Sequence, residues 1–245
     1  MLKPEKKDSI VVTLICLMLI YVGLSLISGF IFQVILKINN FYIPSKIIVS
    51  IGILFYLTYT KKVTIFKNGN FKYGLYTILM TVLLTLLLNF QIQIPTLNHL
   101  NSLLLLPISS GIFEETIFRV LGIYIIGYFS SNLYLKIYLS SIIFGIAHLL
   151  NIISLRQDLF QTIIQVGYAI GLGTIFAISY ISTKNIAFAM IAHVLSDFIS
   201  GLNGLSFKTN IVFNFTSVSF ILLFIMVVII LNYGFIKNNP KLTNG

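Results

Sequence analysis

The chain has 245 residues, of which 58% are hydrophobic and only 9% are charged. Soluble domains carry roughly 25% charged residues, so this composition excludes an ordinary soluble protein and predicts an all-α, polytopic membrane helix bundle. The formal net charge of +10 does not indicate nucleic-acid binding, because most lysines lie singly or in short groups between apolar runs. The single cysteine, Cys16, excludes an internal disulfide and a Cys-x-x-Cys metal site.

Apolar runs bounded by Lys, Asn, Gly and Pro predict eight membrane-spanning helices. We expect them at residues 9–36, 45–60, 73–94, 102–128, 133–151, 159–182, 185–200 and 211–236. The first run is too long for the apolar part of a cleavable signal peptide and is interpreted as a retained span. Pro107 is expected to start or kink the fourth helix. We find no internal repeat, so residues 1–245 are interpreted as a single membrane-embedded domain.

The distribution of basic residues predicts the orientation of the spans. With the N-terminus inside, eleven lysines fall in cytoplasmic segments, and the loop 61–72 contributes the largest share of them, four. Four basic residues fall in outer loops: Lys37, Lys46, Arg156 and Lys208. The positive-inside rule therefore favours cytoplasmic N- and C-termini in a multi-pass protein of the cell membrane, with lipid as its immediate partner.

Six acidic, histidine or arginine residues fall inside the predicted spans, although a charge at that depth costs at least a few kcal/mol. They are Glu114, Glu115 and Arg119 on the fourth span, His148 on the fifth, and His193 and Asp197 on the seventh. Residues four apart share a helix face, so Glu115 can pair with Arg119, and His193 with Asp197. Glu114 lies about 100° around the helix from Glu115. It therefore needs a proton, a metal ion or a partner from another helix, such as His148 or His193.

This set of groups points to the activation of water. Two imidazoles and a carboxylate are typical ligands of a catalytic zinc ion with one position open for water. Without a metal, a buried carboxylate assisted by a histidine can also take a proton from water. No Gly-x-Ser-x-Gly motif is present and Cys16 is far in sequence from both histidines, so a serine or cysteine nucleophile is disfavoured. The alternative is that these residues have only structural roles, with a structural Glu115–Arg119 pair and histidines that form hydrogen bonds only with backbone carbonyls.

Three motifs at these positions resemble a known family. E-E-x-x-x-R stands at residues 114–119, F-x-x-x-H at 144–148, and H-x-x-x-D at 193–197. In this order and on separate predicted spans, they are similar to the CPBP family of intramembrane proteases, also called the CAAX-protease, Abi or Rce1-type family. The resemblance covers the core region 100–201 and includes a branch for bacteriocin processing and self-immunity.

The resemblance implies roles for individual residues. Glu114 would activate water together with His148, while His193 and Asp197 would stabilise the oxyanion or help to hold a metal. All four are therefore also candidate ligands for Zn²⁺, and whether the site uses zinc or a metal-free glutamate stays open.

Further residues of the motifs would support the site. Glu115 and Arg119 would brace it, and Phe144 would pack beside it. The sequence departs from the family pattern at two positions, because Asp197 stands where Asn is common and Val120 where Gly is common.

The function that the resemblance implies is hydrolysis of a peptide bond in a bacterial plasma membrane. The substrate would be a peptide or membrane protein, in peptide or bacteriocin processing, self-immunity or CAAX-like processing. Two alternatives remain: a non-catalytic membrane immunity or scaffold protein, and a proton-coupled transporter, because intramembrane acids and histidines also form proton relays. His99 is interpreted as a solvated residue of the loop before the fourth span.

Overall fold

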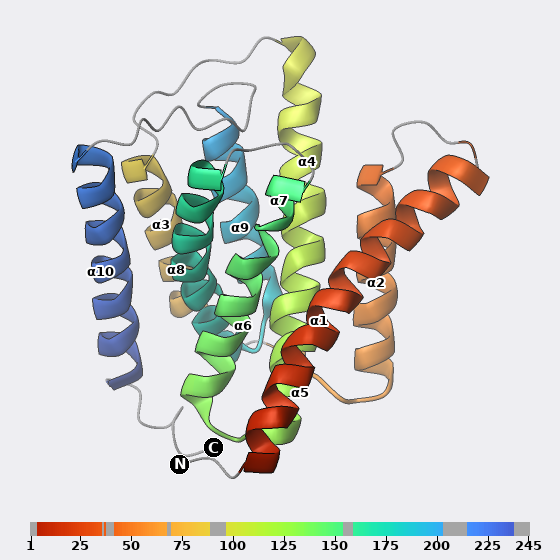
Figure 1. The fold of residues 1–245 in the computed structure, drawn as a ribbon, viewed down its shortest axis with the longest axis horizontal. Coiled ribbons are helices and arrows are strands. Elements are labelled where there is room, and N and C mark those ends of the chain that lie inside the picture. Colours follow the sequence, from red (N-terminus) through yellow and green to blue (C-terminus); the bar gives the residue numbers. More distant parts are fainter. Residues whose placement is uncertain are drawn as a thin grey trace.

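The computed structural model describes residues 4–35, 37, 42–67, 70–88, 97–153, 159–202 and 215–237, and these ranges fold into one helical bundle (Figure 1). The elements are α1 (Pro4–Phe30), the π-helix η1 (Ile31–Ile35), α2 (Tyr42–Tyr59), α3 (Phe71–Leu88), α4 (Leu97–Glu115), the π-helix η2 (Thr116–Leu121), α5 (Gly122–Phe129), α6 (Leu133–Ala147), α7 (Leu150–Ile153), α8 (Leu159–Thr183), α9 (Ile186–Gly201) and α10 (Phe215–Lys237). Each of the eight predicted spans corresponds to a helical segment, so the all-α prediction is confirmed.

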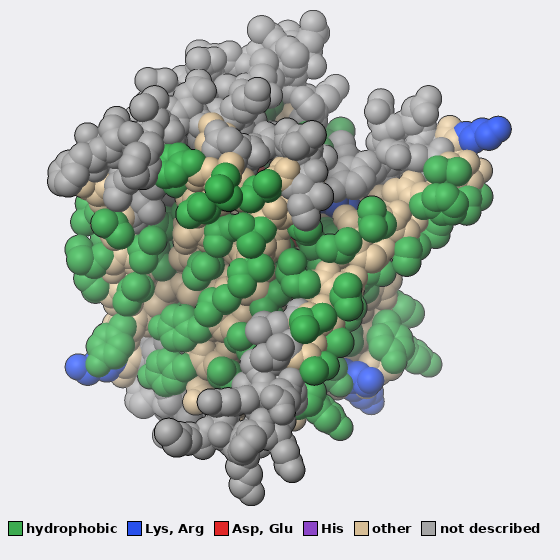
Figure 2. Space-filling view, viewed as in Figure 1, with side chains coloured by type: hydrophobic (Ala, Val, Ile, Leu, Met, Phe, Trp, Pro, Cys, Tyr) green, Lys and Arg blue, Asp and Glu red, His purple; other side chains and the backbone are tan. Residues whose placement is uncertain are grey.

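The bundle carries its apolar residues outside as well as inside, which is typical of a protein surrounded by lipid. Leu26 and Phe55 are both 68% exposed, whereas Glu115 and Arg119 are fully buried. Figure 2 shows hydrophobic side chains over the middle of one face, with most of the visible Lys and Arg atoms near its margins. Within the described ranges, two helical stretches are long and apolar enough to cross a membrane, Leu133–Ile152 and Leu159–Thr183, and shorter apolar helices accompany them.

The helices run alternately in opposite directions, so that α1 begins and α10 ends at the same end of the bundle (Figure 1). We call this the N-terminal end of the bundle. It also carries the loop after α2 and the connections α5–α6 and α8–α9. The arrangement agrees with termini on one side of the membrane, and the assignment of that side to the cytoplasm stays a prediction.

Several predicted boundaries need correction. The fourth segment begins at Leu97, so His99 lies in the first turn of α4 and not in a loop. Pro107 lies inside α4 and does not start it. Lys46 lies in α2 and is only 5% exposed, so the interpretation of this residue as part of an outer loop was wrong. The end of the predicted third span, residues 89–94, lies outside the described residues.

Close helix contacts at glycine hold the centre of the bundle together. A Cβ at Gly111 of α4 would lie 2.7 Å from the side chain of Val194 on α9. A Cβ at Gly145 of α6 would collide with Ile170 on α8 and lie 3.0 Å from the carbonyl oxygen of Val166. Small residues let helix backbones approach one another in membranes. These contacts bring α4, α6, α8 and α9 together around the polar residues described next.

Candidate active site

The candidate site begins where α4 becomes the π-helix η2. Glu114 and Glu115 are the last residues of α4, and Arg119 lies within η2. The wider turn is visible in the bond from the backbone N–H of Gly122 to the carbonyl of Ile117, five residues earlier. Short π-helical segments inside α-helices occur frequently at functional sites. Here the segment directly follows the two carboxylates.

Glu115 joins this helix to α9. Its Oε2 lies 3.2 Å from Nε of Arg119, and its Oε1 lies 2.9 Å from Nδ1 of His193. The Glu115–Arg119 pair expected from the four-residue spacing is therefore present, and both side chains are fully buried. A carboxylate paired with arginine only accepts hydrogen bonds. Nδ1 of His193 therefore carries a hydrogen and donates a hydrogen bond to Oε1 of Glu115. This contact fixes the orientation of the imidazole and directs Nε2 to the other side.

Nε2 of His193 faces the two remaining carboxylates of the site. It lies 3.9 Å from Oε2 of Glu114 and 3.6 Å from Oδ2 of Asp197, one turn further along α9. Glu114 is only 7% exposed, whereas the side chain of Asp197 is 36% exposed. The arrangement places one imidazole nitrogen between a buried carboxylate and a more open one.

Glu114 also has a partner that the sequence did not indicate. The hydroxyl of Tyr21 on α1 donates to Oε1 of Glu114 at 3.2 Å. The ring of Tyr21 packs against Phe113 and Phe118, with centroid separations of 5.6 and 5.2 Å. Glu114 therefore finds its partners on α1 and α9, and not on its own helix.

Arg119 is held by aromatic faces as well as by Glu115. Its guanidinium carbon lies 4.2 Å from the ring centroid of Phe144 on α6 and 5.5 Å from that of Phe176 on α8. A cation over an aromatic face is stabilised by about 2 kcal/mol or more when water is excluded. Gly173 of α8 allows this approach, because a Cβ there would lie 3.0 Å from Nη2 of Arg119.

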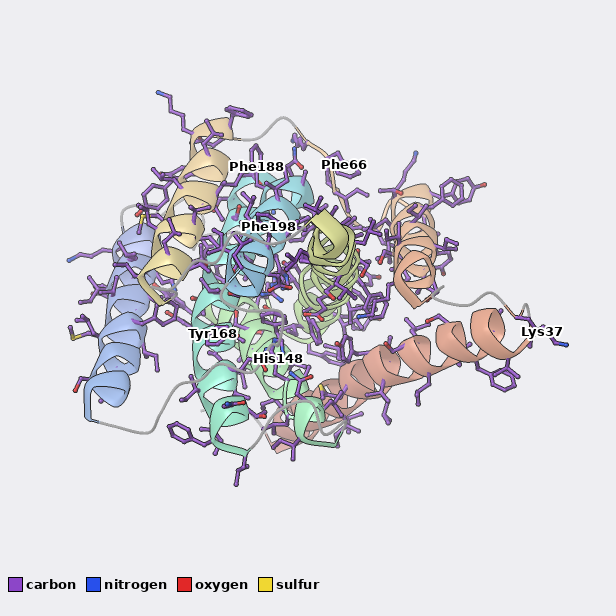
Figure 3. The ribbon with its side chains drawn as sticks, turned by 90° about the horizontal axis from the view of Figure 1, so that it is seen from above. Lys37, Phe66, His148, Tyr168, Phe188 and Phe198 are labelled. Carbon is purple, nitrogen blue, oxygen red and sulfur yellow. The ribbon has the colours of Figure 1, made fainter. Side chains whose placement is uncertain are left out.

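His148 lies at the edge of this cluster, at the end of α6, and is labelled in Figure 3. Its ring packs edge-on against Phe144 with centroids 5.2 Å apart, and Phe144 contacts His193 in the same manner at 5.4 Å. His148 is close enough to interact electrostatically with Glu114, His193 and Arg119. Phe144 thus contacts both of the imidazoles that the sequence analysis selected.

Lys46 is a second residue that the sequence analysis did not assign to the site. It projects from α2 with its ammonium group 5.6 Å from the ring centroid of Phe113, and its charge acts on Asp197. Glu114, Glu115 and Asp197 supply three negative charges, while Arg119 and Lys46 supply two positive charges. A protonated His193 would balance the set, which matters because unpaired buried charges are strongly unfavourable.

The four candidate zinc ligands do not form a ready metal site. Among the described residues, no group of three or more His, Cys, Asp or Glu side chains could hold a metal ion. The residues present therefore do not fit zinc as they stand, and we derive no step through a metal.

Comparison with known proteins identifies one family. Residues 95–199 match the family described as Type II CAAX prenyl endopeptidase Rce1-like. The matched segment contains every site residue named above except Tyr21 and Lys46. No curated protein matches the chain, and no solved structure matches it.

Proposed function

We propose that this protein hydrolyses peptide bonds with water activated by Glu114 and His148. Its Rce1-like segment at residues 95–199 places it in the CPBP family of membrane-embedded endopeptidases. The observation that carries this proposal is the approach of Glu114 on α4 to His193 on α9 at 3.9 Å, between two helices that are far apart in the sequence. Such an arrangement inside an apolar bundle is difficult to explain by structural pairing alone, because Glu115 and Arg119 already pair with each other.

Glu114 is the proposed general base. A water molecule between Glu114 and His148 would give a proton to the carboxylate as its oxygen attacks the peptide carbonyl carbon. The hydrogen bond from Tyr21 supports this role, because it holds one carboxylate oxygen at 3.2 Å and leaves the other facing His193. The same proton would then pass from Glu114 to the leaving amine, so that the products are a carboxylate and an amine.

His193 and Asp197 are proposed to stabilise the charge that develops on the carbonyl oxygen. The bond from Nδ1 to Glu115 holds the imidazole in place, so that a protonated Nε2 can donate to the oxyanion without reorganisation. Asp197, 3.6 Å from the same nitrogen, favours the protonated imidazole. Glu115 and Arg119 act here as positioning residues.

The proposed substrates are peptides or membrane proteins whose cleavable bond can reach the buried cluster. This class includes peptide or bacteriocin maturation, self-immunity and CAAX-like processing in a bacterial plasma membrane. The carboxylate of Asp197 is partly exposed, which supports the entry of a polar peptide backbone into the site next to Asp197.

The proposal is tested with protein purified and reconstituted in liposomes. Glu114→Gln and His148→Gln should each lower cleavage by about 10²–10⁴-fold, because each removes a group that handles the proton. Suitable probes are a prenylated peptide ending in a CAAX sequence and a panel of unprenylated membrane-anchored peptides. Glu5→Gln and His99→Gln change residues of the same types that belong to none of the three motifs, and these matched controls should cleave normally. Cleavage should also persist in the presence of 1,10-phenanthroline.

Three results would contradict the proposal. Normal cleavage by both Glu114→Gln and His148→Gln would remove the assigned base. Protection of a host cell that survives in Glu114→Gln would favour a non-catalytic immunity or scaffold protein. Substrate-dependent proton flux across the liposome membrane, without cleavage, would favour a transporter.

A further inference from the structure

A cavity of about 420 Å³ lies at the N-terminal end of the bundle, and it shares no lining residue with the candidate active site. Its walls come from the loop after α2, from η2 and α5, from α6 and from the end of α8. Three of the residues that line it are lysines: Lys62, Lys136 and Lys184. The tyrosines Tyr124, Tyr128 and Tyr180 also line it.

The lysines bring positive charges close together at one wall of the bundle. Burial, followed by the charges of Lys136 and Lys67, lowers the pKa of Lys184 below its ordinary value. Lys184 lies in the connection between α8 and α9, where three lysines from separate segments meet. None of the described residues that line the cavity is Asp or Glu. Convergent like charges repel one another, so an anion bound among them would relieve this repulsion.

Backbone hydrogen bonds hold two of the segments that carry these lysines in register. The N–H of Lys67 donates to the carbonyl of Lys184 at 3.0 Å, and the N–H of Ile186 donates to that of Ile65 at 2.9 Å. The hydroxyl of Tyr180 adds a bond of 3.2 Å to the carbonyl of Thr64. The loop after α2 is therefore fixed to the α8–α9 connection, and the cavity has a preformed frame.

From this combination we propose that the cavity binds a phosphate group, carried either by the head group of an anionic lipid or by a small soluble phosphate compound. Lysine is a common ligand of phosphate as a point charge. The apolar side chains of Val63, Val120, Ile123 and Ile181 form part of the same wall, which suits the glycerol and upper acyl region of a lipid. Anionic lipids concentrate where lysines lie at the ends of membrane spans.

The test uses the full chain in nanodiscs and compares two pairs of substitutions. Lys136→Gln with Lys184→Gln removes two charges from the cavity. Lys72→Gln with Lys237→Gln removes two charges from exposed positions at the same end of the bundle, outside the cavity. Lipid retention by native mass spectrometry is measured in phosphatidylcholine with and without phosphatidylglycerol. The cavity pair should weaken retention of phosphatidylglycerol by roughly tenfold or more, and the exposed pair should change it much less.

A second arm distinguishes a soluble ligand from a lipid. Inorganic phosphate and glycerol phosphate are titrated into protein in phosphatidylcholine nanodiscs, and the thermal unfolding midpoint is recorded. A saturable rise that the cavity pair abolishes would assign the site to soluble phosphate compounds, and selective loss of phosphatidylglycerol alone would assign it to lipid.

A third variant separates binding from a failure to fold. Gly127→Val narrows the cavity and crowds the flexible side chain of Lys136 without changing charge, because a Cβ at Gly127 would lie 3.3 Å from Cε of Lys136. It should also weaken phosphate binding. Equal losses in the cavity and exposed pairs would show only general surface attraction. Such equal losses of phosphatidylglycerol retention would overturn the proposal. Unchanged phosphate binding in both the cavity pair and Gly127→Val would also overturn it.

Discussion

Arg119 and Glu115 illustrate how much one residue can depend on its partner inside an apolar bundle. Both are fully buried, and neither can be rehydrated without opening the helices around them. Removing one member of a buried ion pair typically destabilises a protein by about 3–5 kcal/mol, because the other charge is left uncompensated. Removing both charges is much less harmful. The pair can therefore be examined separately from the chemistry of the site.

We expect Arg119→Met to lower the free energy of unfolding by about 3–5 kcal/mol, since Glu115 then keeps a buried charge. The double variant Glu115→Gln, Arg119→Met should recover a large part of this loss. Its peptidase activity should nevertheless stay low, because His193 no longer has a charged partner at Nδ1. Denaturant titration in micelles and cleavage in liposomes measure the two effects.

A double variant that is no more stable than Arg119→Met would contradict this account of Arg119. It would mean that the contacts of the guanidinium with Phe144 and Phe176 matter more than the charge of Glu115.

At the scale of residues, the sequence predicted contacts within a helix and the approach of Glu114 to a histidine of another helix, but it missed the other contacts between helices. The Glu115–Arg119 pair follows from the four-residue spacing, which depends only on helical geometry. The contacts of Glu115 with His193 and of Tyr21 with Glu114 depend on how helices pack, which no local pattern contains. Lys46 was misplaced because a charged residue near the start of an apolar run looks like the end of a loop.

At the scale of elements, hydropathy located the helices well. The predicted spans 133–151, 159–182 and 185–200 agree with α6–α7, α8 and α9 to within a few residues. The π-helix η2 was not predicted, because a local shift in hydrogen bonding leaves the apolar pattern of a long run unchanged. The feature nearest to the carboxylates was therefore the one that the pattern could not indicate.

The α6–α8 contact gives a prediction at this scale. Gly145→Val should lower the free energy of unfolding by about 1–3 kcal/mol, because its side chain would meet Ile170 and the backbone of Val166. It should also lower peptidase activity, since the neighbouring Phe144 packs against the rings of both His148 and His193. Thermal unfolding and the liposome cleavage assay measure both effects.

Gly52→Val provides the matched control on α2, where a Cβ would meet no atom within 4 Å. It should unfold and cleave like the unmodified protein. If Gly145→Val behaved in the same way as Gly52→Val, the close approach of α6 to α8 would not be what holds Phe144 in place.

At the scale of the whole molecule, the composition alone predicted an apolar exterior around a small polar centre. The structure agrees, because the most exposed large side chains are apolar while Glu115 and Arg119 are fully buried. Orientation depends on a different signal, the position of lysines at the ends of the helices. The N-terminal end of the bundle carries Lys61, Lys62 and Lys184, and we expect it to face the cytoplasm.

This orientation is tested with single cysteines introduced after Cys16→Ser. Thr64→Cys and Ser131→Cys lie at the N-terminal end of the bundle and should react with a membrane-impermeant maleimide only after cells are permeabilised. Lys208→Cys, in a segment that the sequence predicts to be outside, should react in intact cells. The opposite labelling pattern would reverse the orientation, and with it the side on which the lysine-lined cavity meets the lipid.

The hydrogen bond from Tyr21 and the charge of Lys46 have a consequence for protein engineering. Both residues precede the segment 95–199 that carries the family signature, yet both reach its carboxylates. A truncated gene product or a chimera designed around that signature alone would therefore inherit the motif residues without the first two helices that complete their surroundings. The smallest unit that can be transplanted with its site intact is therefore longer than the matched segment 95–199.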